Sequence, residues 1–481
     1  MTILNYNDKN AFIGLDTYYP LANGKKTRRI YLDSAASSLM LKPASDAVLQ
    51  YLRHYANTHT SVHTSAHITS KTMAWSYQQI LSFVHADSEK YLTTFIGSGT
   101  TAVANRIAAG LSKLRPQKKV VLISSMEHHS NDLPHRTHAQ QIEHIPLNGE
   151  GQHSGQISLQ GLEQLLTQYQ GRVNYVAVSG VSNVTGIINP IQQIAELTHR
   201  FDALLVVDGA QMVAHMPVNV THMDIDFFMF SGHKVYAPGS PGVLVAKTEL
   251  IEALLPAQFG GGMVDTVSKW NFEINADLVE REQAGTPNIP GAITLACVLA
   301  YLKKRGMDEV YAQEIALTHW SLEQLATCRT ITIYGEHPTQ AHIASIAFNL
   351  KHIGHGLVAA ILNDYFGIAV RNECFCAHPY VHELLKEDFE ELADLDLDNT
   401  AMEKVFQNRR GMVRASFGLY TTKEDIKTLV NALKDIEDNI ENYQSLYANK
   451  KDGSYIHKTF QPCLKQIFDI ENALFSPLEK Q

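Results

Sequence analysis

Short apolar runs alternate with helix-like stretches from about residue 31 to residue 292 of this chain. The runs have the length and composition of buried strands, and they include VVLIS (120–124), VNYVAVSG (173–180), LLVVD (204–208) and GVLVAK (242–247). Between them lie stretches of helical character, such as 160–170 and 190–201. Strands that alternate with helices build a mostly parallel sheet covered by helices. We therefore predict an α/β fold.

The chain is long enough for more than one domain, with 481 residues of which 45% are hydrophobic. We predict a large domain over residues 31–292, entered by a strand at Arg29–Leu32. Residues 1–30 and 293–447 are assigned to a smaller α/β domain. Residues 448–481 form a polar tail that ends in a short apolar stretch, and this tail is either a docking helix or a free end.

Charge and composition exclude several classes of partner. The net charge is −9, which argues against nucleic acid, because binding to phosphates needs a basic surface. No apolar run approaches the roughly 18 residues of a membrane span. The first residues lack the basic-then-apolar pattern of a signal peptide, and five sparse cysteines do not indicate a disulfide framework. We expect a cytoplasmic protein.

A lysine directly after a buried strand gives the first chemical signal. The apolar run 227–230 leads into Ser231, Gly232, His233 and Lys234. Burial lowers the pKa of a lysine, and a neutral amine can form a Schiff base. The neighbouring serine and histidine are hydrogen-bonding residues that suit a phosphate. The segment indicates pyridoxal 5'-phosphate on Lys234, although an ordinary surface lysine is the plain alternative.

An acid at the end of another strand supports the cofactor. Asp208 ends the run LLVVD, and Gln211 follows three positions later. Ligands of open α/β sheets lie beyond the carboxyl ends of the strands. An aspartate there can pair with the pyridinium nitrogen of pyridoxal phosphate and keep it protonated. The alternative is that Asp208 caps the next helix.

The order of these motifs resembles the class V aminotransferase family of fold-type I pyridoxal-phosphate enzymes. Within the family, the chain is most similar to group II cysteine desulfurases and selenocysteine lyases. The match runs from YLDSAASSLMLKP (31–43) to VRASFGLYTTKEDI (413–426) and covers most of the chain. The resemblance implies a large cofactor-binding domain and a smaller C-terminal domain on which residues 1–30 pack.

The resemblance also implies which residues hold the cofactor. The Gly99–Thr100–Thr101 turn opens a helix, whose N-terminal N–H groups favour an anion. At this turn Ala102 replaces the glutamate that is frequent in the family. The implied contacts are with the phosphate for Thr101, Ser231 and His233, with the ring for His128, Asn183 and Asp208, and with the partner subunit's phosphate for Thr286. Thr100 and Gln211 are two further implied cofactor-binding residues. A residue that serves the partner's site implies a homodimer.

The substrate side of the site is implied by one arginine and one loop. Arg414 matches the family's carboxylate-binding arginine, whose planar fork binds a carboxylate with two hydrogen bonds. Arg371 and Asn183 are the other implied substrate contacts. In VRNECFCAHPYV (370–381), Cys376 falls on the catalytic cysteine. Cys374 is an additional thiol, either a second sulfur carrier or a small apolar filler, and we favour the filler.

The implied reaction removes sulfur from L-cysteine, or selenium from selenocysteine. Lys234 and His128 act beside the cofactor, and Lys234 takes the α-proton. The Cys376 thiolate takes the sulfur as a persulfide, with His378 or a substrate group as possible base, and alanine leaves. The persulfide is then passed to an acceptor, for which a sulfur-acceptor protein is one candidate. The sequence does not distinguish cysteine from selenocysteine, and it does not identify the acceptor.

Some features depart from the family pattern. Thr64 and Ser65 replace an Arg-Gly pair, and His63 and His67 have a spacing that metal sites use, although we expect no metal. An acidic insertion occupies residues 382–399, and it is either a solvated face or a cover for the site.

Two other functions stay open. One is a different class V enzyme, such as a C–S lyase, an epimerase or a molybdenum-cofactor sulfurase, in which Cys376 is not the sulfur acceptor. The other is a scaffold without catalysis. Lys234, Asp208, Gln211, His233 and Arg414 occur together, which argues against a scaffold, because a scaffold does not need this set.

Overall fold

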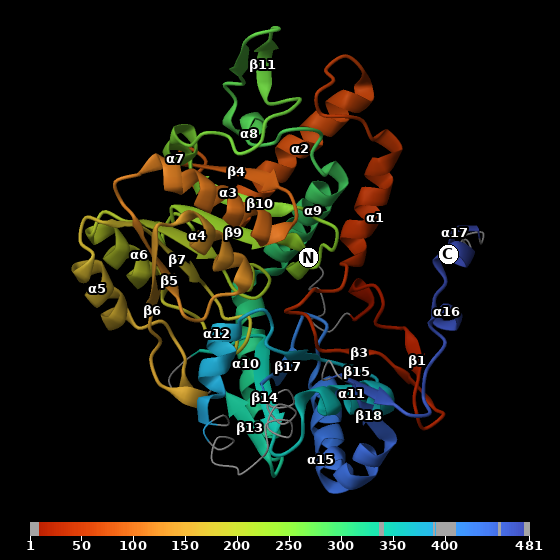
Figure 1. The fold of residues 1–481 in the computed structure, drawn as a ribbon. Coiled ribbons are helices and arrows are strands. Elements are labelled where there is room, and N and C mark those ends of the chain that lie inside the picture. The colour runs from red at the N-terminus through yellow and green to blue at the C-terminus, as the bar shows by residue number, and fades with distance from the viewer. Residues whose placement is uncertain (1–8, 336–340, 388–389, 391–409, 451–453, 476–481) are drawn as a thin grey trace.

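The computed structural model describes residues 9–335, 341–387, 390, 410–450 and 454–475. Figure 1 shows two units that contact each other. The larger unit, above, contains the larger sheet, and the smaller unit, below, contains a smaller sheet with its helices. No helix within these described ranges is long and apolar enough to cross a membrane.

A seven-stranded sheet forms the centre of the larger unit, in the order β4-β10-β9-β8-β7-β5-β6. The strands are β4 (Tyr91–Ile96), β5 (Val120–Ser124), β6 (Gln141–Ile145), β7 (Val173–Ser179), β8 (Leu204–Asp208), β9 (Phe227–Ser231) and β10 (Gly242–Lys247). β10 runs antiparallel to both its neighbours, and the other pairs are parallel. This agrees with the predicted mostly parallel sheet.

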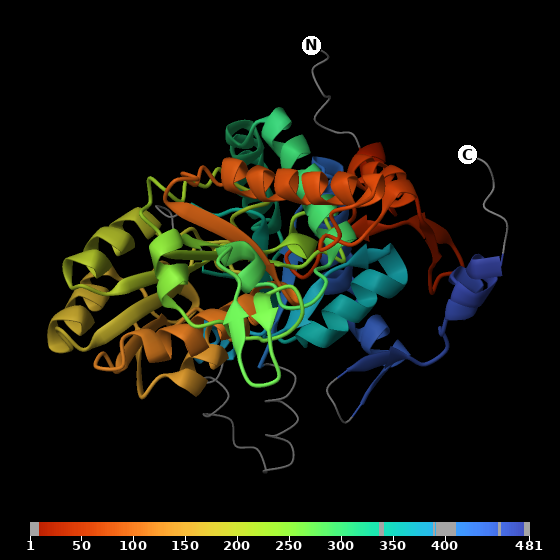
Figure 2. The ribbon, with the colours of Figure 1, turned by 90° about the horizontal axis from the view of Figure 1, so that it is seen from above.

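Helices cover both faces of this sheet, as Figures 1 and 2 show. They are α1 (Lys42–Tyr51), α2 (Thr64–Phe83), α3 (Gly99–Leu114), α4 (Leu133–His138), α5 (Leu159–Gln168), α6 (Ile191–Arg200), α7 (Thr248–Ala253), α8 (Leu278–Arg281) and α9 (Ile289–Arg305). A short antiparallel pair, β11 (Val264–Val267) and β12 (Phe272–Ile274), projects beyond α8. Strands β5, β7, β8, β9 and β10 are buried along almost their whole length, which explains their largely apolar sequence, whereas the edge strand β6 is mostly only half-buried and carries polar residues.

The smaller unit is built on an antiparallel sheet in the order β13-β14-β17-β16. Its elements are α10 (Met307–Leu325), β13 (Ile331–Tyr334), β14 (Ser345–Leu350), α11 (His355–Phe366), β15 (Ile368–Ala369), β16 (Arg371–Glu373), α12 (His378–Leu384), β17 (Met412–Ser416) and α15 (Lys423–Leu446). Thr422 and Asp425 form a capping box that starts α15, where each satisfies a backbone N–H of the other. α11 and α15 pack together on this sheet around buried residues such as Phe348 and Leu433.

The N-terminal strands join the smaller unit. β1 (Tyr18–Pro20) pairs with β2 (Lys26–Arg28), and β3 (Ile30–Tyr31) pairs in parallel with β15. The strand predicted at Arg29–Leu32 is thus shorter than expected, and it lies outside the central sheet. The predicted boundary between residues 292 and 293 falls within α9, a helix that packs on α1 and α2. The division into domains stays a prediction.

The C-terminal tail forms an ordered hairpin before its last helices. β18 (Tyr447–Asn449) pairs with β19 (Tyr455–His457), and α16 (Leu464–Ile467) and α17 (Ile470–Phe475) follow. The Tyr365 hydroxyl of α11 is 2.9 Å from Nε2 of His457. This contact holds the hairpin against α11, on the same side of the smaller unit as β16.

Candidate active site

A cavity of about 270 Å³ opens beyond the carboxyl ends of the central strands, where the smaller unit meets them. This is the position at which open α/β sheets bind ligands. The predicted residues that line it are Thr100, Thr101, His128, Asn183, Asp208, Ser231, His233, Lys234, Arg371, Cys376 and Arg414. The structure therefore brings together eleven predicted residues from segments far apart in the sequence. We call this space the central cavity.

Lys234 and Asp208 reach the central cavity from the ends of two adjacent strands. β8 ends at Asp208, and β9 leads into the short helical turn that contains Lys234. Burial lowers the pKa of the Lys234 amine, and the Asp208 carboxylate opposes this shift. Asp208 Oδ1 accepts a hydrogen bond of 2.9 Å from the backbone N–H of Ala210. The site thus pairs an amine that loses its proton more readily than usual with a buried carboxylate.

His128 follows β5 and presents a neutral ring to the cavity. Its Nδ1 accepts a hydrogen bond of 3.1 Å from the backbone N–H of Ser130. Burial and the nearby Lys234 lower the pKa of His128 to about 3. A neutral imidazole can lie against an aromatic ring without adding charge, which is the role that the family resemblance predicts.

A cradle of hydroxyl groups surrounds the start of α3. The Ser231 Oγ lies 2.7 Å from both the backbone nitrogen and the Oγ1 of Thr100, and it accepts from that N–H. Thr101 Oγ1 lies 2.6 Å from the Ser130 hydroxyl. A Cβ atom at Gly99 would lie 2.7 Å from Ser231 Oγ, and the φ of this residue is +64°. Only glycine fits there without strain, so the backbone approaches the cradle closely.

Arg414 is buried at the floor of the cavity with two of its three nitrogens bonded. Nη1 donates to the carbonyl oxygen of Asn183 at 2.8 Å, and Nη2 donates to Asp33 Oδ1 at 3.2 Å. The guanidinium also lies 4.9 Å from the ring centre of Phe375. Nε is buried without a protein partner. A buried donor without a partner is rare in native proteins.

The loop that carries Cys376 has a strained backbone held by specific bonds. Glu373, Phe375 and Cys376 all have positive φ, at 89°, 50° and 56°. Such conformations cost energy for residues other than glycine and persist where neighbours enforce them. The Asn183 side-chain amide donates to the carbonyl of Phe375 at 2.9 Å, and the backbone N–H of His129 donates to the carbonyl of Cys376 at 2.7 Å. The Cys376 side chain is exposed at the cavity.

Two predicted cofactor residues do not line the cavity. Gln211 is buried, and its Nε2 donates to the carbonyl of Ala35 at 2.9 Å, so it supports the wall from behind. Thr286 is exposed and accepts a hydrogen bond of 3.0 Å from the side chain of Asn57. Its contribution to a partner subunit stays a prediction.

Sequence reasoning missed three residues of the site. Asp33 holds Arg414, Ser130 holds Thr101 and His128, and Phe375 packs on Arg414. Asp33 and Ser130 belong to the motifs YLDSAASS and EHHSN. Their position within motifs that match the family could therefore have predicted that they lie near the site. The contact of Phe375 was not readable from the sequence.

Other predicted features lie outside the cavity. His63 Nδ1 accepts the N–H of Ala66 and caps α2, which is a structural role. Most of the acidic insertion 382–399 is outside the described residues. At its described start, the carboxylate of Glu383 accepts a hydrogen bond of 3.3 Å from the backbone N–H of Gly151.

Comparison with known proteins gives a consistent result. The family model for aminotransferase class-V matches residues 30–429. The chain is 34% identical over 411 residues to a probable cysteine desulfurase of Halalkalibacterium halodurans, which covers 84% of this chain and 92% of that protein. It is also 34% identical over 414 residues to a cysteine desulfurase of Shigella flexneri, over 84% of this chain and 93% of the relative.

Solved structures share the fold. The apo cysteine desulfurase of Thermococcus onnurineus NA1 superposes with a TM-score of 0.74 at 29% identity, over 85% of this chain and 95% of that one. The cysteine desulfurase CsdA of Escherichia coli gives a TM-score of 0.71 at 27% identity, over 92% of this chain and all of that one. The predicted resemblance, fold type and enzyme class are confirmed.

Proposed function

We propose, on the premise that this chain belongs to the class-V aminotransferase family, that it is a cysteine desulfurase whose Cys376 accepts sulfur beside a pyridoxal phosphate held by Lys234. The observation that carries the proposal is that Lys234, Cys376 and Arg414 line one cavity although they come from different elements. An amine, a thiol and a carboxylate-binding cation at one site are the groups that removal of sulfur from an amino acid requires.

The residues present fit the cofactor. Lys234 would hold it covalently, Asp208 would pair with the ring nitrogen, and His128 would lie against the ring. The hydroxyl cradle of Thr100, Thr101 and Ser231, with His233 beside it, would bind the phosphate. When bound, pyridoxal phosphate supplies an electron sink for the charge that develops at the substrate α-carbon.

Substrate binding would use the buried arginine. Arg414 lines the central cavity, and its guanidinium would donate to the substrate carboxylate. Hydrogen bonds to Asn183 and Asp33 fix the guanidinium, so its orientation does not depend on substrate. Arg371, at the rim of the same cavity, would add a second cation.

Proton and sulfur movements follow from the remaining groups. Lys234 Nζ would take the proton from the substrate α-carbon, because burial favours its neutral form. The Sγ of Cys376 then attacks the substrate sulfur. The carbon–sulfur bond breaks, a sulfur–sulfur bond forms on Cys376, and alanine leaves after protonation. The same groups would handle selenocysteine.

Assembly and location are part of the proposal. The enzyme would be a homodimer in which Thr286 completes the partner's phosphate site. All five cysteines are free, which suits a reducing compartment, and we place the enzyme in the cytoplasm. A sulfur acceptor would take the persulfide from Cys376.

The test measures alanine released from L-cysteine by the enzyme loaded with pyridoxal phosphate. We expect wild type to form alanine and Cys376→Ala to form none while keeping its cofactor absorbance. Cys463→Ala is the matched control, because Cys463 is also an exposed thiol but lies in the tail before α16. Equal rates in wild type and Cys376→Ala, or pyruvate in place of alanine, would instead assign the chain to the C–S lyases.

A further inference from the structure

A second hollow adjoins the Cys376 loop. It has a volume of about 520 Å³ and is bounded by α11, by residues 368–376 and by the end of the hairpin β18–β19. Arg371, Phe375 and Cys376 line both this hollow and the central cavity. The loop is therefore a shared wall, and Cys376 borders both spaces. We call the second space the outer groove.

The outer groove has an excess of positive charge. Among the described residues that line it, Arg371 and Arg410 are exposed cations and Glu373 is the one carboxylate. His355 is buried and contributes no charge at neutral pH, because burial and the nearby Arg410 lower its pKa to about 4. The remaining titratable groups on this wall, within the described part of the chain, are His378, Tyr455 and the two cysteines. This balance favours an anionic ligand.

Arg410 is tied to the cysteine loop through its backbone. The thiol of Cys374 donates to the carbonyl oxygen of Arg410 at 3.1 Å. Burial raises the pKa of Cys374 to about 11, so this thiol stays protonated and keeps donating. Cys374 thus serves as an anchor that places the Arg410 backbone beside the loop, and it is poorly suited to carry sulfur itself.

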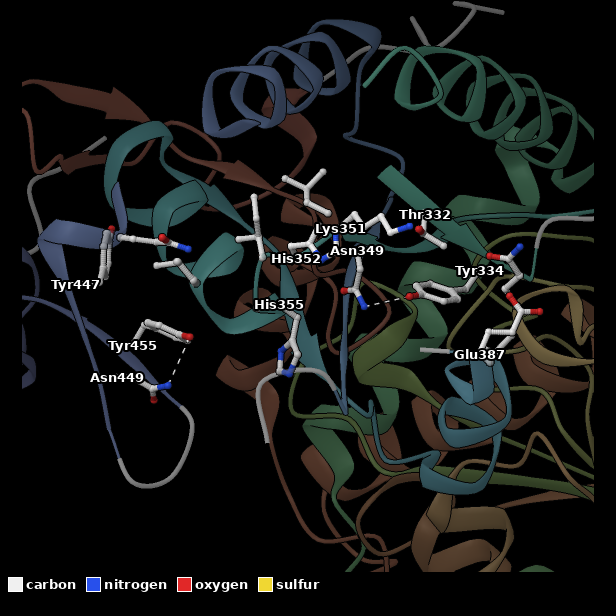
Figure 3. Close-up of a pocket in the computed structure, with 17 residues that line it drawn as sticks. Thr332, Tyr334, Asn349, Lys351, His352, His355, Glu387, Tyr447, Asn449 and Tyr455 are labelled. Atoms are coloured by element: carbon white, nitrogen blue, oxygen red, sulfur yellow. Dashed lines mark hydrogen bonds between the residues drawn. The ribbon is translucent and has the colours of Figure 1, made fainter. Parts of the chain in front are cut away.

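The far edge of the outer groove comes from a segment beyond the family match. Ser454 and Tyr455 close it, whereas the family match ends at residue 429. Tyr455 and His355 also border a neighbouring pocket of about 610 Å³, in which Lys351 and Tyr447 are visible (Figure 3). The hairpin therefore adds a boundary that gives the outer groove the size of a small-molecule site.

We propose that the outer groove binds a small thiol that carries a carboxylate, and that this thiol removes the sulfur from Cys376. The inference rests on the proposed function, because it needs a persulfide on Cys376. The carboxylate would lie against Arg410, and the thiolate would attack the outer sulfur of the persulfide. The new sulfur–sulfur bond forms on the small thiol as the old one breaks, and Cys376 leaves as a thiolate. No oxidant or reductant is needed.

The experiment separates sulfur removal from sulfur discharge. Holoenzyme is mixed with one equivalent of L-cysteine per active site to measure the burst of alanine, because L-cysteine in excess is itself a thiol with a carboxylate. A probe thiol is then added, and the rate at which the persulfide on Cys376 is lost is followed as the discharge rate. The probes are 3-mercaptopropionate, 2-mercaptoethanol and cysteamine, which carry a negative, no and a positive charge, and they are compared at equal thiolate concentration. We expect discharge to be fastest with 3-mercaptopropionate.

The decisive variant is Arg410→Ala, with Lys351→Ala as the matched loss of one cation in the neighbouring pocket. We expect Arg410→Ala to give the same burst of alanine as wild type. Its discharge rate with 3-mercaptopropionate should fall roughly threefold to fivefold, which is the order expected for one exposed charge contact. Lys351→Ala should match wild type.

Equal discharge by the three thiols, or equal effects of the two variants, would overturn the outer-groove proposal. Absence of the burst in wild type would refute the proposed function itself, so the two failures are distinguishable.

Discussion

His378 Nδ1 lies 3.0 Å from Nε2 of His129, and the two imidazole rings are parallel to within 6°. His129 follows the ring-facing His128, and its backbone N–H donates to the carbonyl of Cys376. Two bonds therefore connect the cysteine loop to the turn that faces the predicted cofactor. This pairing couples the position of the thiol to the position of the ring.

Loss of the imidazole at position 378 should loosen this connection. We expect His378→Ala to lower the rate of alanine formation by about twofold to tenfold, which corresponds to one hydrogen bond of roughly 0.5–1.5 kcal/mol. His378→Gln keeps a side-chain donor and should retain most of the rate. Both rates are measured with saturating cofactor, together with the rate at which iodoacetamide alkylates Cys376, which should rise in His378→Ala.

His319→Ala is the control, because His319 is an exposed histidine on α10. Should the alanine and glutamine variants at position 378 behave alike in both assays, the hydrogen bond would have no role in holding the loop.

The two cysteines of the loop should differ in reactivity. Cys376 is exposed, whereas Cys374 is buried and its pKa is raised to about 11. At pH 8 very little of the Cys374 thiol is ionised, and thiolates are the reactive form. We expect peptide mass spectrometry to find iodoacetamide on Cys376 before Cys374.

Cys374→Ser should keep alanine formation, since a hydroxyl can also donate to the carbonyl of Arg410. A complete loss of turnover in this variant with the cofactor still bound would show that Cys374 carries sulfur.

Arg414→Lys should weaken substrate binding without releasing the cofactor. Lysine cannot keep the bonds to Asn183 and Asp33 while also offering a donor to the substrate carboxylate. We expect KM for L-cysteine to rise about tenfold or more, since hydrogen bonds to charged groups are worth roughly 1.5–3 kcal/mol. Steady-state kinetics checks this, and the cofactor absorbance should be unchanged.

A change confined to kcat would place Arg414 outside the carboxylate site. Arg200→Lys is the control, because Arg200 makes only a surface pair with Glu163 among the described contacts.

Three of the central strands could be predicted closely because each is an apolar run that stops at a polar residue. The runs 120–124, 204–208 and 242–247 coincide with β5, β8 and β10. The reversed direction of β10 was not predictable, because burial on both faces gives parallel and antiparallel strands the same pattern. The pairing of β3 with β15 joins segments more than three hundred residues apart, which no local pattern encodes.

The site was predictable to the extent that its residues lie in compact motifs. Lys234, Asp208 and Arg414 each stand at the end of, or within, a recognisable strand, and all three line the cavity. Gln211 was expected to contact the cofactor, yet its amide bonds the backbone of Ala35, a choice that depends on the tertiary position of residue 35. The outer groove also depends on tertiary packing, because the hairpin β18–β19 lies beside α11 only in the folded chain.

A buried histidine beneath the site should make the fold sensitive to acid. His135 Nδ1 lies 2.9 Å from the Tyr175 hydroxyl, and Nε2 lies 3.0 Å from Oδ1 of Asn131, so the neutral ring is fully bonded. Burial lowers the pKa of His135 to about 3.

An unfolded histidine takes up its proton near pH 6.5, so this residue contributes stability above that pH, and the contribution is lost as the pH falls toward 3. Between pH 6.5 and pH 5 the loss should be about 1.5–2 kcal/mol, from roughly 1.4 kcal/mol per pH unit. We expect the Tm of wild type to fall more steeply over this interval than the Tm of His135→Gln, which offers a donor and an acceptor but does not titrate. Parallel Tm curves for the two proteins would mean that His135 is protonated in the folded state, against the burial and bonding described here.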